Sequence, residues 1–401
     1  MKNTNLSFYE DSSTKKRILI SSLYPLGGNY GGLLQAYALQ RVITDMGFEV
    51  TTIDSSRRYS ALRYALRRIR YTVRRAKRDK ATAYPANESQ TAALQEKPLN
   101  FISRYINTID YHGLPKGKRR QCLENTSAIV VGSDQVWRGG YADVLDQFLQ
   151  DAEGCSLTKV SYAASFGADR LIRFSPRVKR RASELAKQFS AISVREESGI
   201  KICRDEFGVD ATQHVDPTLL LGRADYEAII RASTEQSDEH LGGVFAYVLD
   251  RSPEVEALIE KVAENHASGV NDFYLDLPTV KSDLTQRLDS FCMKPVEAWL
   301  TGIANADFVV TDSFHGTVFS IIFNKPFLSI ANDGRGRARF ESLLKLFGLE
   351  SRLVNARDVT EISDLAVPDW DSVEEKISAE RERSIRYLHE YLIDESASSE
   401  A

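Results

Sequence analysis

Short apolar runs alternate with helical patterns along most of the chain. Runs such as RILISSL at 17–23 and SAIVVGSD at 127–134 predict strands, and the first is followed by a turn and by apolar residues at helical spacing. A second series begins at 244–250 and continues through 307–312 and 326–332. Strands that alternate with helices form parallel sheets covered on both faces, so the chain is predicted to be an α/β protein with two Rossmann-like domains.

Polar segments mark where these domains are expected to begin and end. The segment RASTEQSDEHLGG is the best candidate for a linker, and a long helical pattern near the C-terminus is expected to cross back over the first domain. The predicted divisions are a polar tail at 1–16, an N-terminal domain at 17–230, a linker at 231–243, a C-terminal domain at 244–365, a C-terminal helix at 366–395 and a disordered tail at 396–401. The simplest assembly has a cleft between the domains, beside the carboxyl ends of the strands.

Charge changes this picture at one place. The chain has 52 Lys and Arg residues against 56 Asp and Glu, a formal net charge of −4 that indicates no particular partner. Residues 57–80, however, hold eleven basic residues and one acid, a net charge of +10, so the other 377 residues sum to −14. An amphipathic helix is predicted there by apolar residues that recur every three or four positions, at Leu62, Leu66, Ile69 and Val73.

The sequence leaves two interpretations of this basic helix open. It is either a solvated helix that packs on its own domain or a contact for an anionic partner, such as lipid headgroups, a charged glycan or a lipid-linked diphosphate. Nucleic acid is not expected, because no nucleic-acid-binding motif accompanies the charge. Neither a membrane-spanning apolar run nor a secretory leader is recognised, so a cytoplasmic protein is expected, held at the inner face of the membrane if the helix binds lipid.

Polar residues follow the first and third predicted strands. PLGGNYGGLLQAYAL at 25–39 is glycine-rich but is neither the dinucleotide fingerprint nor a P-loop, so it is either a ligand site or a structural turn. In VVGSDQVW, the tryptophan is either a core anchor or a platform for a sugar ring. The candidates for contact with a sugar are Asn29, Tyr30, Gly31, Gln35, Ser133 and Trp137.

Three residues are candidates for catalysis. Asp134 is either a general base or the cap of the next helix. Arg195 ends a strand in SVREESG and suits a carboxylate or phosphate, or else pairs with a neighbouring acid. His315 begins a helix in TDSFHGTVF, where the positive helix end favours a bound anion. HExxH, GxSxG and metal-ligand patterns are missing from the sequence, so no metal site is predicted.

The chain resembles the polysaccharide pyruvyl transferase family in seven ordered segments that span about 17–350. Each segment is weak alone, but seven in one order are specific. They are GGNYGGLLQAYAL, VVGSDQVW, VSYAASFG, SVREESG, HVDPTLLL, TDSFHGTVFSIIFNKPF and RFESLLKLFGL. The resemblance implies a GT-B-like fold and transfer of pyruvate from phosphoenolpyruvate to two hydroxyls of a sugar in a polysaccharide or lipid-linked precursor, which forms a ketal and releases phosphate. It implies no cofactor and no divalent metal.

The resemblance also implies roles for the candidates. Arg195 and His315 match family positions associated with phosphoenolpyruvate, with His315 as general acid and Asp134 as the group that activates a hydroxyl. Many members have Arg-Leu-His where this chain has Ser-Phe-His, so the cation beside the histidine must come from elsewhere or the chain forms a subgroup. The residues expected to bind phosphoenolpyruvate are Arg195, Ser313, His315, Gly316, Thr317, Arg335 and Arg337, with Arg339 as a further source of the cation.

Two other classes of protein fit the same pattern. One is a GT-B glycosyltransferase that uses a nucleotide sugar, and the other is a non-catalytic glycan-binding protein. Consumption of a nucleotide sugar would indicate the glycosyltransferase, and binding of a glycan without turnover would indicate the binding protein. The acceptor sugar, its pair of hydroxyls and the oligomeric state cannot be predicted from the sequence.

Overall fold

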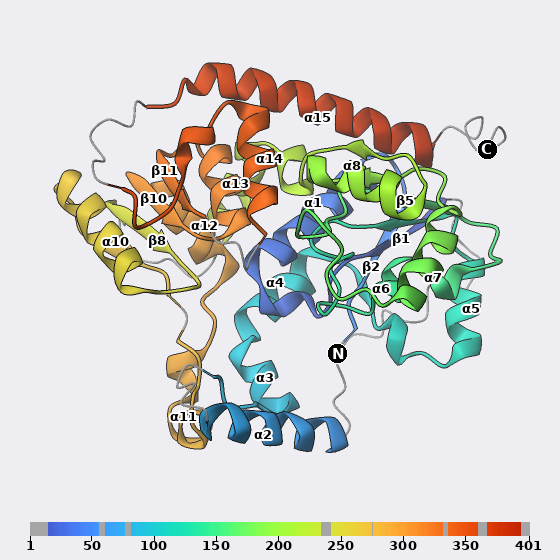
Figure 1. Ribbon diagram of the computed structural model, residues 1–401, viewed down its shortest axis with the longest axis horizontal. Helices are drawn as coiled ribbons and strands as arrows, with labels where there is room; N and C mark the ends of the chain where they lie inside the picture. Colours follow the sequence, from blue (N-terminus) through green and yellow to red (C-terminus); the bar gives the residue numbers. More distant parts are fainter. Residues whose placement is uncertain are drawn as a thin grey trace.

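The computed structural model describes residues 15–55, 61–76, 82–233, 242–274, 276–331, 336–359 and 367–393. Most of the predicted N-terminal tail, most of the predicted linker and the whole of the predicted C-terminal tail lie outside these ranges. Within them, the chain forms two parallel five-stranded sheets with helices packed against them (Figure 1). This confirms the predicted fold class, two Rossmann-like domains in a GT-B-like arrangement.

The first sheet has the strand order β3-β2-β1-β4-β5. Its central strand β1 is buried along its whole length, as expected of a strand covered on both faces, and Ile18 lies opposite Val50 on one side and Ala128 on the other. The strands are β1 (Arg17–Ser21), β2 (Glu49–Ile53), β3 (Thr108–Ile109), β4 (Ala128–Val131) and β5 (Thr158–Ser161). A two-stranded sheet follows, β6 (Ser193–Val194) and β7 (Thr212–Gln213).

Two helices of this half lie apart from the sheet. The others are α1 (Tyr30–Asp45), α4 (Glu96–Tyr105), α5 (Lys116–Glu124), α6 (Val144–Gln147), α7 (Pro176–Ala186), α8 (Glu197–Ile202) and α9 (Arg223–Arg231). The two that lie apart, α2 (Ala61–Ala76) and α3 (Glu88–Leu94), form a projection together with α11 of the second half (Figure 1). The helix α2 is the described part of the basic helix predicted at 57–80.

The second sheet has the strand order β12-β11-β10-β8-β9. Its strands are β8 (Val244–Tyr247), β9 (Val270–Asp272), β10 (Phe308–Thr311), β11 (Phe327–Ile330) and β12 (Leu353–Val354). Its helices are α10 (Pro253–Asn265), α11 (Lys281–Gln286), α12 (Val296–Asn305), α13 (Phe314–Ile322) and α14 (Arg337–Phe347). β10 leads directly into α13, so a strand end and a helix start lie side by side at this junction.

The two halves share one hydrophobic core. Tyr30, at the start of α1, stacks on Trp299 of α12 with ring centroids 5.9 Å apart, and its hydroxyl donates a 2.8 Å hydrogen bond to the carbonyl of Lys294. Tyr247 and Phe273 of the second half contact the same ring edge-on. The first helix of the N-terminal half is therefore fixed to the C-terminal half by aromatic packing.

The C-terminal helix α15 (Trp370–Leu392) crosses back over the first half, as predicted (Figure 1). Near its start, Lys376 donates to the carbonyl of Phe347 in α14. Farther along, Ser384 contacts His214 at 3.0 Å, and the Tyr387 hydroxyl donates a 2.9 Å hydrogen bond to the carbonyl of Ser161 at the end of β5. One helix thus binds both halves.

The Tyr387 hydrogen bond is buried, so its loss should be measurable. We expect Tyr387→Phe to lower the free energy of unfolding by about 1–3 kcal/mol, because the Ser161 carbonyl is left without this donor. Tyr391→Phe, one turn on in the same helix and partly exposed, should change it by no more than about 0.5 kcal/mol. Denaturant unfolding of both variants checks this, and equal stability of the two would show that the crossing helix is not fastened through Tyr387.

Candidate functional site

A buried carboxylate brings the two main candidates together. Asp216 caps the 3₁₀ turn at Pro217–Leu220, and its Oδ2 accepts a 2.7 Å hydrogen bond from Arg195 Nη1. His315 Nε2 lies 3.4 Å from the same oxygen, within ion-pair distance but without hydrogen-bond geometry. The other oxygen accepts hydrogen bonds from the amide and hydroxyl of Thr218. Arg195 comes from the first half and His315 from the second, so the cluster lies where the halves meet.

Electrostatics keep this cluster charged in spite of its burial. Burial alone would raise the pKa of Asp216, but the nearby His315 and Arg195 and the bonds from Thr218 lower that pKa well below its usual range. Burial opposes the charge of Arg195 as well, yet the adjacent carboxylates of Asp216, Asp134 and Glu196 raise the pKa of its guanidinium. Asp216 is therefore a carboxylate and Arg195 a cation at neutral pH.

Asp134 is the second partner of Arg195. Its Oδ1 accepts from Arg195 Nη2 at 3.4 Å, a much longer contact than the one to Asp216. Asp134 has a backbone φ of +68°, in the left-handed region. This conformation is unfavourable for residues that carry a side chain, and where it occurs it often marks a functional position. The alternative prediction, that it caps the next helix, is wrong, because α6 is capped by Asp143.

Two helix starts meet beside His315. Its ring lies so close to Gly31 in the first turn of α1 that a methyl group there would overlap the imidazole. Asn29 caps α1 by accepting from the amides of Gly31 and Gly32, and Ser313 caps α13 by accepting from the amide of Gly316. Both helices point their positive ends towards the Arg195–Asp216–His315 cluster, which favours a bound anion there.

Arg339 is the candidate that the structure offers for the cation expected beside His315, because it lies next to Phe314 and Arg195. It is buried in the first turn of α14, and its guanidinium lies 5.3 Å from the centre of the Phe314 ring, which also packs against the guanidinium of Arg195 at 4.3 Å. Burial and the nearby charge of Arg195 lower the pKa of Arg339 to about 10, so it remains a cation at neutral pH.

The other two arginines of this segment are not placed beside the histidine. Arg337 lies on the exposed side of α14 and forms a 2.7 Å ion pair with Glu341, so its prediction as a ligand of the donor is not supported by its position. Arg335 lies outside the described residues.

Several predicted contact residues are part of the core instead. Trp137 stacks on Phe148 and donates its indole N–H to the carbonyl of Gln147, so it is a core anchor and not a sugar platform. Tyr30 is buried against Trp299, and its hydroxyl is already bonded to a backbone carbonyl. These placements correct the predictions of acceptor contact at both residues. Burial was not visible in the pattern, because an aromatic residue near a strand end serves either purpose.

Four further predicted residues are buried close to the cluster and do not reach its surface. Gln35 is fully buried and bonds to the hydroxyl of Ser22 and the amide of Ser133. The hydroxyl of Ser133 donates to the carbonyl of Ala163 and lies 3.4 Å from Asp216. The remaining two, Gly316 and Thr317, are buried in α13, where Thr317 bonds to the hydroxyl of Ser329. None of these four, among the described residues, lines either of the two openings described next.

A pocket of about 760 Å³ opens on one side of the cluster. Asp134, Asn29 and Gly32 form its inner wall, and Tyr141 and Gln95 contribute further polar atoms. Arg67 of α2 lines the same pocket. The pocket reaches Asp134, and Arg195 and His315 lie behind that carboxylate.

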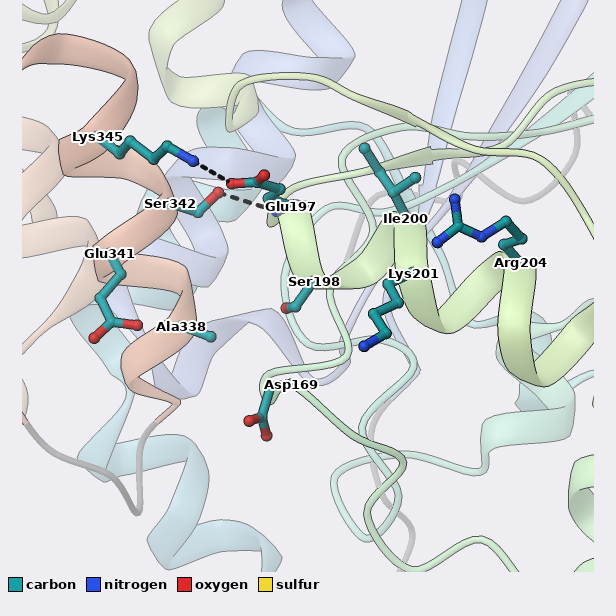
Figure 2. Close-up of a pocket in the computed structure, with 10 residues that line it drawn as sticks. All are labelled: Asp169, Glu197, Ser198, Ile200, Lys201, Arg204, Ala338, Glu341, Ser342 and Lys345. Atoms are coloured by element: carbon teal, nitrogen blue, oxygen red, sulfur yellow. Dashed lines mark hydrogen bonds and ion pairs between the residues drawn. The ribbon is translucent and has the colours of Figure 1, made fainter.

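A second opening lies between the two halves. It is a groove of about 570 Å³ between α8 and α14, bridged by Lys345 and Ser342, which both contact Glu197 (Figure 2). Its remaining lining has mixed charge, with Asp169 and Glu341 as well as Lys201 and Arg204 (Figure 2). Of the described residues, those that line this groove do not include Arg195 or Asp134. We therefore place the candidate site at the pocket that ends on Asp134.

Asp216 is the functional residue that the sequence analysis missed. It lies in HVDPTLLL, one of the seven segments, but an Asp before Pro at the start of a turn also has the appearance of a simple cap. It does cap a turn, through Oδ1, and it uses Oδ2 for the cluster. No group of His, Cys, Asp and Glu suited to a metal ion occurs within the described ranges.

The fold and the site together define a GT-B-like α/β protein with a buried cluster of charged residues at the junction of its halves. The chain belongs to the polysaccharide pyruvyl transferase family, whose sequence profile matches residues 29–334. The protein is accordingly a transferase that acts in polysaccharide synthesis on a sugar acceptor. No curated protein matches the chain.

Solved structures with a similar arrangement have little sequence in common with this chain. The UDP-GlcNAc 2-epimerase of Methanocaldococcus jannaschii is 11% identical, with a TM-score of 0.45 over 93% of this chain and 99% of its own. A UDP co-structure of MnaA from S. aureus is 10% identical, with a TM-score of 0.49, and the match covers 94% of this chain and 97% of that one. An α-glucosyltransferase in complex with UDP and DNA is 9% identical, with a TM-score of 0.44, and the match covers 94% of this chain and 95% of that one. With TM-scores below 0.5, these likenesses say nothing about what this chain binds.

The contact between Gly31 and His315 gives a test of the site's construction. Gly31→Ala should lower the free energy of unfolding by about 1–3 kcal/mol, because the added methyl group forces α1 and His315 apart. Gly32→Ala is the matched control, since a methyl group there would meet Asp134 at an ordinary 3.6 Å and a helical Ala replaces a helical Gly. We expect Gly32→Ala to be neutral or stabilising by up to about 1 kcal/mol in thermal and denaturant unfolding. Equal destabilisation by both changes would contradict the close approach.

Proposed function

We propose that the protein is a phosphoenolpyruvate-dependent pyruvyltransferase that forms a pyruvate ketal on two hydroxyls of a sugar and releases phosphate. The observation that carries this proposal is the buried cluster of Arg195, Asp216 and His315, with Arg339 beside it. Phosphoenolpyruvate has a carboxylate and a phosphate, and two buried guanidiniums that face one aromatic ring suit two anionic groups. The proposed reaction uses phosphoenolpyruvate as a donor substrate and needs no cofactor.

The long contact between Arg195 and Asp134 suggests how the donor enters. Asp216 is held at 2.7 Å, whereas Asp134 is held at 3.4 Å and borders the pocket. An anionic group of the donor would take the place of Asp134 at Arg195, because the shorter contact to Asp216 keeps the guanidinium in position. Asp134 would then be free to accept a proton from an acceptor hydroxyl in the same pocket.

The chemistry follows in two additions to one carbon. His315 gives a proton to C3 of phosphoenolpyruvate, which becomes a methyl group and leaves C2 electron-poor. One sugar hydroxyl adds to C2 and passes its proton to Asp134. The second hydroxyl then forms its own bond to C2 while the bond from C2 to the phosphate oxygen breaks, and its proton leaves with the phosphate. Arg195 and Arg339 stabilise the charge on the departing phosphate, and Asp216 is a positioning residue that keeps Arg195 and His315 in place.

The pocket next to Asp134 is the proposed place for the acceptor sugar. Its volume of about 760 Å³ and its polar lining by Asn29, Gln95, Thr91 and Asp54 suit a sugar with several hydroxyls. Of the residues predicted for the acceptor, only Asn29 is exposed in this pocket. The four cysteines are all free thiols, which suits the reducing cytoplasm, where we place the reaction.

Variants of the three catalytic candidates should behave differently from one another. His315→Ala should lower kcat by about 10²–10⁴-fold, the usual contribution of a general acid. Arg195→Ala should raise KM for phosphoenolpyruvate and lower kcat, because it removes both binding and charge stabilisation. Asp134→Asn should lower kcat while KM for phosphoenolpyruvate stays the same or falls, since the competing carboxylate at Arg195 is gone. Phosphate release gives these constants, with His389→Ala, an exposed residue of α15, as the control.

Unchanged phosphate release in both His315→Ala and Arg195→Ala, with folding verified by thermal unfolding, would overturn the assignment. A raised KM in Asp134→Asn would overturn the replacement of Asp134 by the donor and leave the reaction itself standing.

Arg339 and Arg337 form a second matched pair on one helix. Arg339→Gln should weaken phosphoenolpyruvate binding by about tenfold or more, because a buried cation beside Arg195 is lost. Arg337→Gln should leave binding within about twofold of wild type, because its exposed ion pair with Glu341 contributes little. Isothermal titration calorimetry with phosphoenolpyruvate measures the affinity of both variants. Weaker binding in Arg337→Gln than in Arg339→Gln would mean that the missing cation comes from Arg337.

The reaction class is tested by the choice of donor. The protein is incubated with a panel of glycosides and either phosphoenolpyruvate or a nucleotide sugar. We expect phosphate release and the mass gain of a pyruvate ketal with phosphoenolpyruvate only. Consumption of the nucleotide sugar with phosphoenolpyruvate ignored would make the protein a glycosyltransferase, and glycan binding without any turnover would make it a binding protein.

A further inference from the structure

Within the described part of the chain, the side chains of α2 that are less exposed lie on one of its faces. Tyr71 donates a 2.7 Å hydrogen bond to the carbonyl of Thr279 and packs edge-on against Tyr84, with ring centroids 5.0 Å apart. Tyr64, two turns earlier, reaches the carbonyl of Pro85. These tyrosines hold α2 to the projection that it forms with α3 and α11 (Figure 1).

The apolar stripe of α2 lies on the opposite face. Leu66, Ile69 and Val73 are 46%, 58% and 50% exposed. At about 100° per residue, Ile69 stands about 200° from Tyr71 around the helix axis. An amphipathic helix of a globular protein normally turns its apolar stripe towards the core, whereas α2 turns it to the solvent. The packing of the fold therefore does not explain these three residues.

The charge of α2 indicates the kind of surface that would cover the stripe. Its sixteen residues include six arginines and no acid, and the wider segment 57–80 has a net charge of +10. Arg70 and Arg74 flank the stripe on one side, where their long side chains can reach past the aliphatic groups. Aliphatic residues on one face with arginines beside them are typical of helices that lie in the interface of an anionic membrane. Among the described residues, no helix is long and apolar enough to cross a bilayer.

We propose that α2 docks on the surface of an anionic lipid bilayer. Leu66, Ile69 and Val73 enter the boundary between headgroups and acyl chains, and Arg70 and Arg74 lie among the lipid phosphates. A second copy of the chain is a poorer occupant, because it would bring two strongly basic segments together, and three aliphatic side chains cover much less than the roughly 800 Å² per partner of a stable interface. A nucleic acid would pair with the arginines but leave the stripe in water.

Docking would also place the candidate site next to the membrane. Arg67 of α2 and Asp134 line the same pocket, so the pocket extends from the reacting groups to the docked helix. If the proposed function holds, a sugar carried on a membrane lipid can reach Asp134 from this side. Docking itself does not depend on the reaction, since it uses residues outside the catalytic cluster.

Flotation with vesicles tests the docking. The wild-type protein should float with vesicles of phosphatidylcholine mixed with phosphatidylglycerol, should not float with phosphatidylcholine alone, and should be released by high salt. Leu66→Ser/Ile69→Ser/Val73→Ser should lower the partition coefficient by about tenfold or more. Arg70→Gln/Arg74→Gln should lower it by roughly 25-fold, because each basic residue near the surface contributes about a factor of five.

Two matched controls remove the same groups elsewhere. Arg177→Gln/Arg180→Gln removes two exposed arginines from α7, and Val367→Ser removes an exposed valine that is 73% accessible. Both should float like wild type. Docking through α2 is excluded if the triple serine variant floats as well as wild type, or if the α7 variant loses as much binding as the α2 variant.

Activity on a water-soluble glycoside separates docking from catalysis. The α2 variants should keep wild-type phosphate release with such an acceptor even when they no longer float. A wild-type protein that floats but does not turn over phosphoenolpyruvate would overturn the proposed function and leave the docking intact. Loss of a concentration-dependent dimer in the triple serine variant, without any vesicle binding by wild type, would show that a second copy covers the stripe.

Discussion

The carboxylate of Asp216 is the interaction on which the site depends. It lies in a buried region between a guanidinium from one half of the molecule and an imidazole from the other. A lone charge in such a place is strongly unfavourable, and an ion pair there is tolerated only when its other bonding positions are also satisfied. Thr218 satisfies the remaining oxygen of Asp216, and Phe314 covers the flat face of Arg195. Removal of this carboxylate would take away the shorter ion pair of Arg195 and leave its guanidinium with the 3.4 Å contact to Asp134 and the nearby charge of Glu196, so the positions of Arg195 and His315 both depend on this one residue.

The same junction explains why the site lies where it does. Aromatic packing of Tyr30 on Trp299 fixes the start of α1 against the second half, and this brings Gly31 against His315. Apolar contacts thus set the geometry within which the few charged residues of the cluster lie. Asp134 is the exception, because its backbone lies in the left-handed region, its ion pair with Arg195 is long, and it lines the pocket. A residue held less firmly than its neighbours is well suited to exchange its partner when a substrate arrives.

The sequence predicted most of the fold because strands and helices leave periodic patterns. It also singled out Arg195 and His315 as candidates because they follow strands, and the structure brings both to Asp216. It did not distinguish a buried aromatic from an exposed one, so Tyr30 and Trp137 were assigned to the acceptor. It could not choose among Arg335, Arg337 and Arg339, since only the packing of α14 on Phe314 brings one of them to the cluster. Periodicity likewise identified the apolar stripe of α2 but not the direction that it faces. In each case the missing information is a contact between residues far apart in the chain.

The crossing helix α15 has a consequence for how the protein is made. The carbonyls of Ser161 and Leu219 and the imidazole of His214 belong to the first half, yet each bonds to a side chain of α15, which follows the second sheet in the chain. Buried polar groups without partners are unfavourable, so a nascent chain that has emerged only as far as the second sheet still presents an incomplete and partly polar surface on the first. These polar groups gain their partners only after α15 has left the ribosome. Synthesis from the N-terminus therefore does not yield two finished domains in turn, and the first half is completed last.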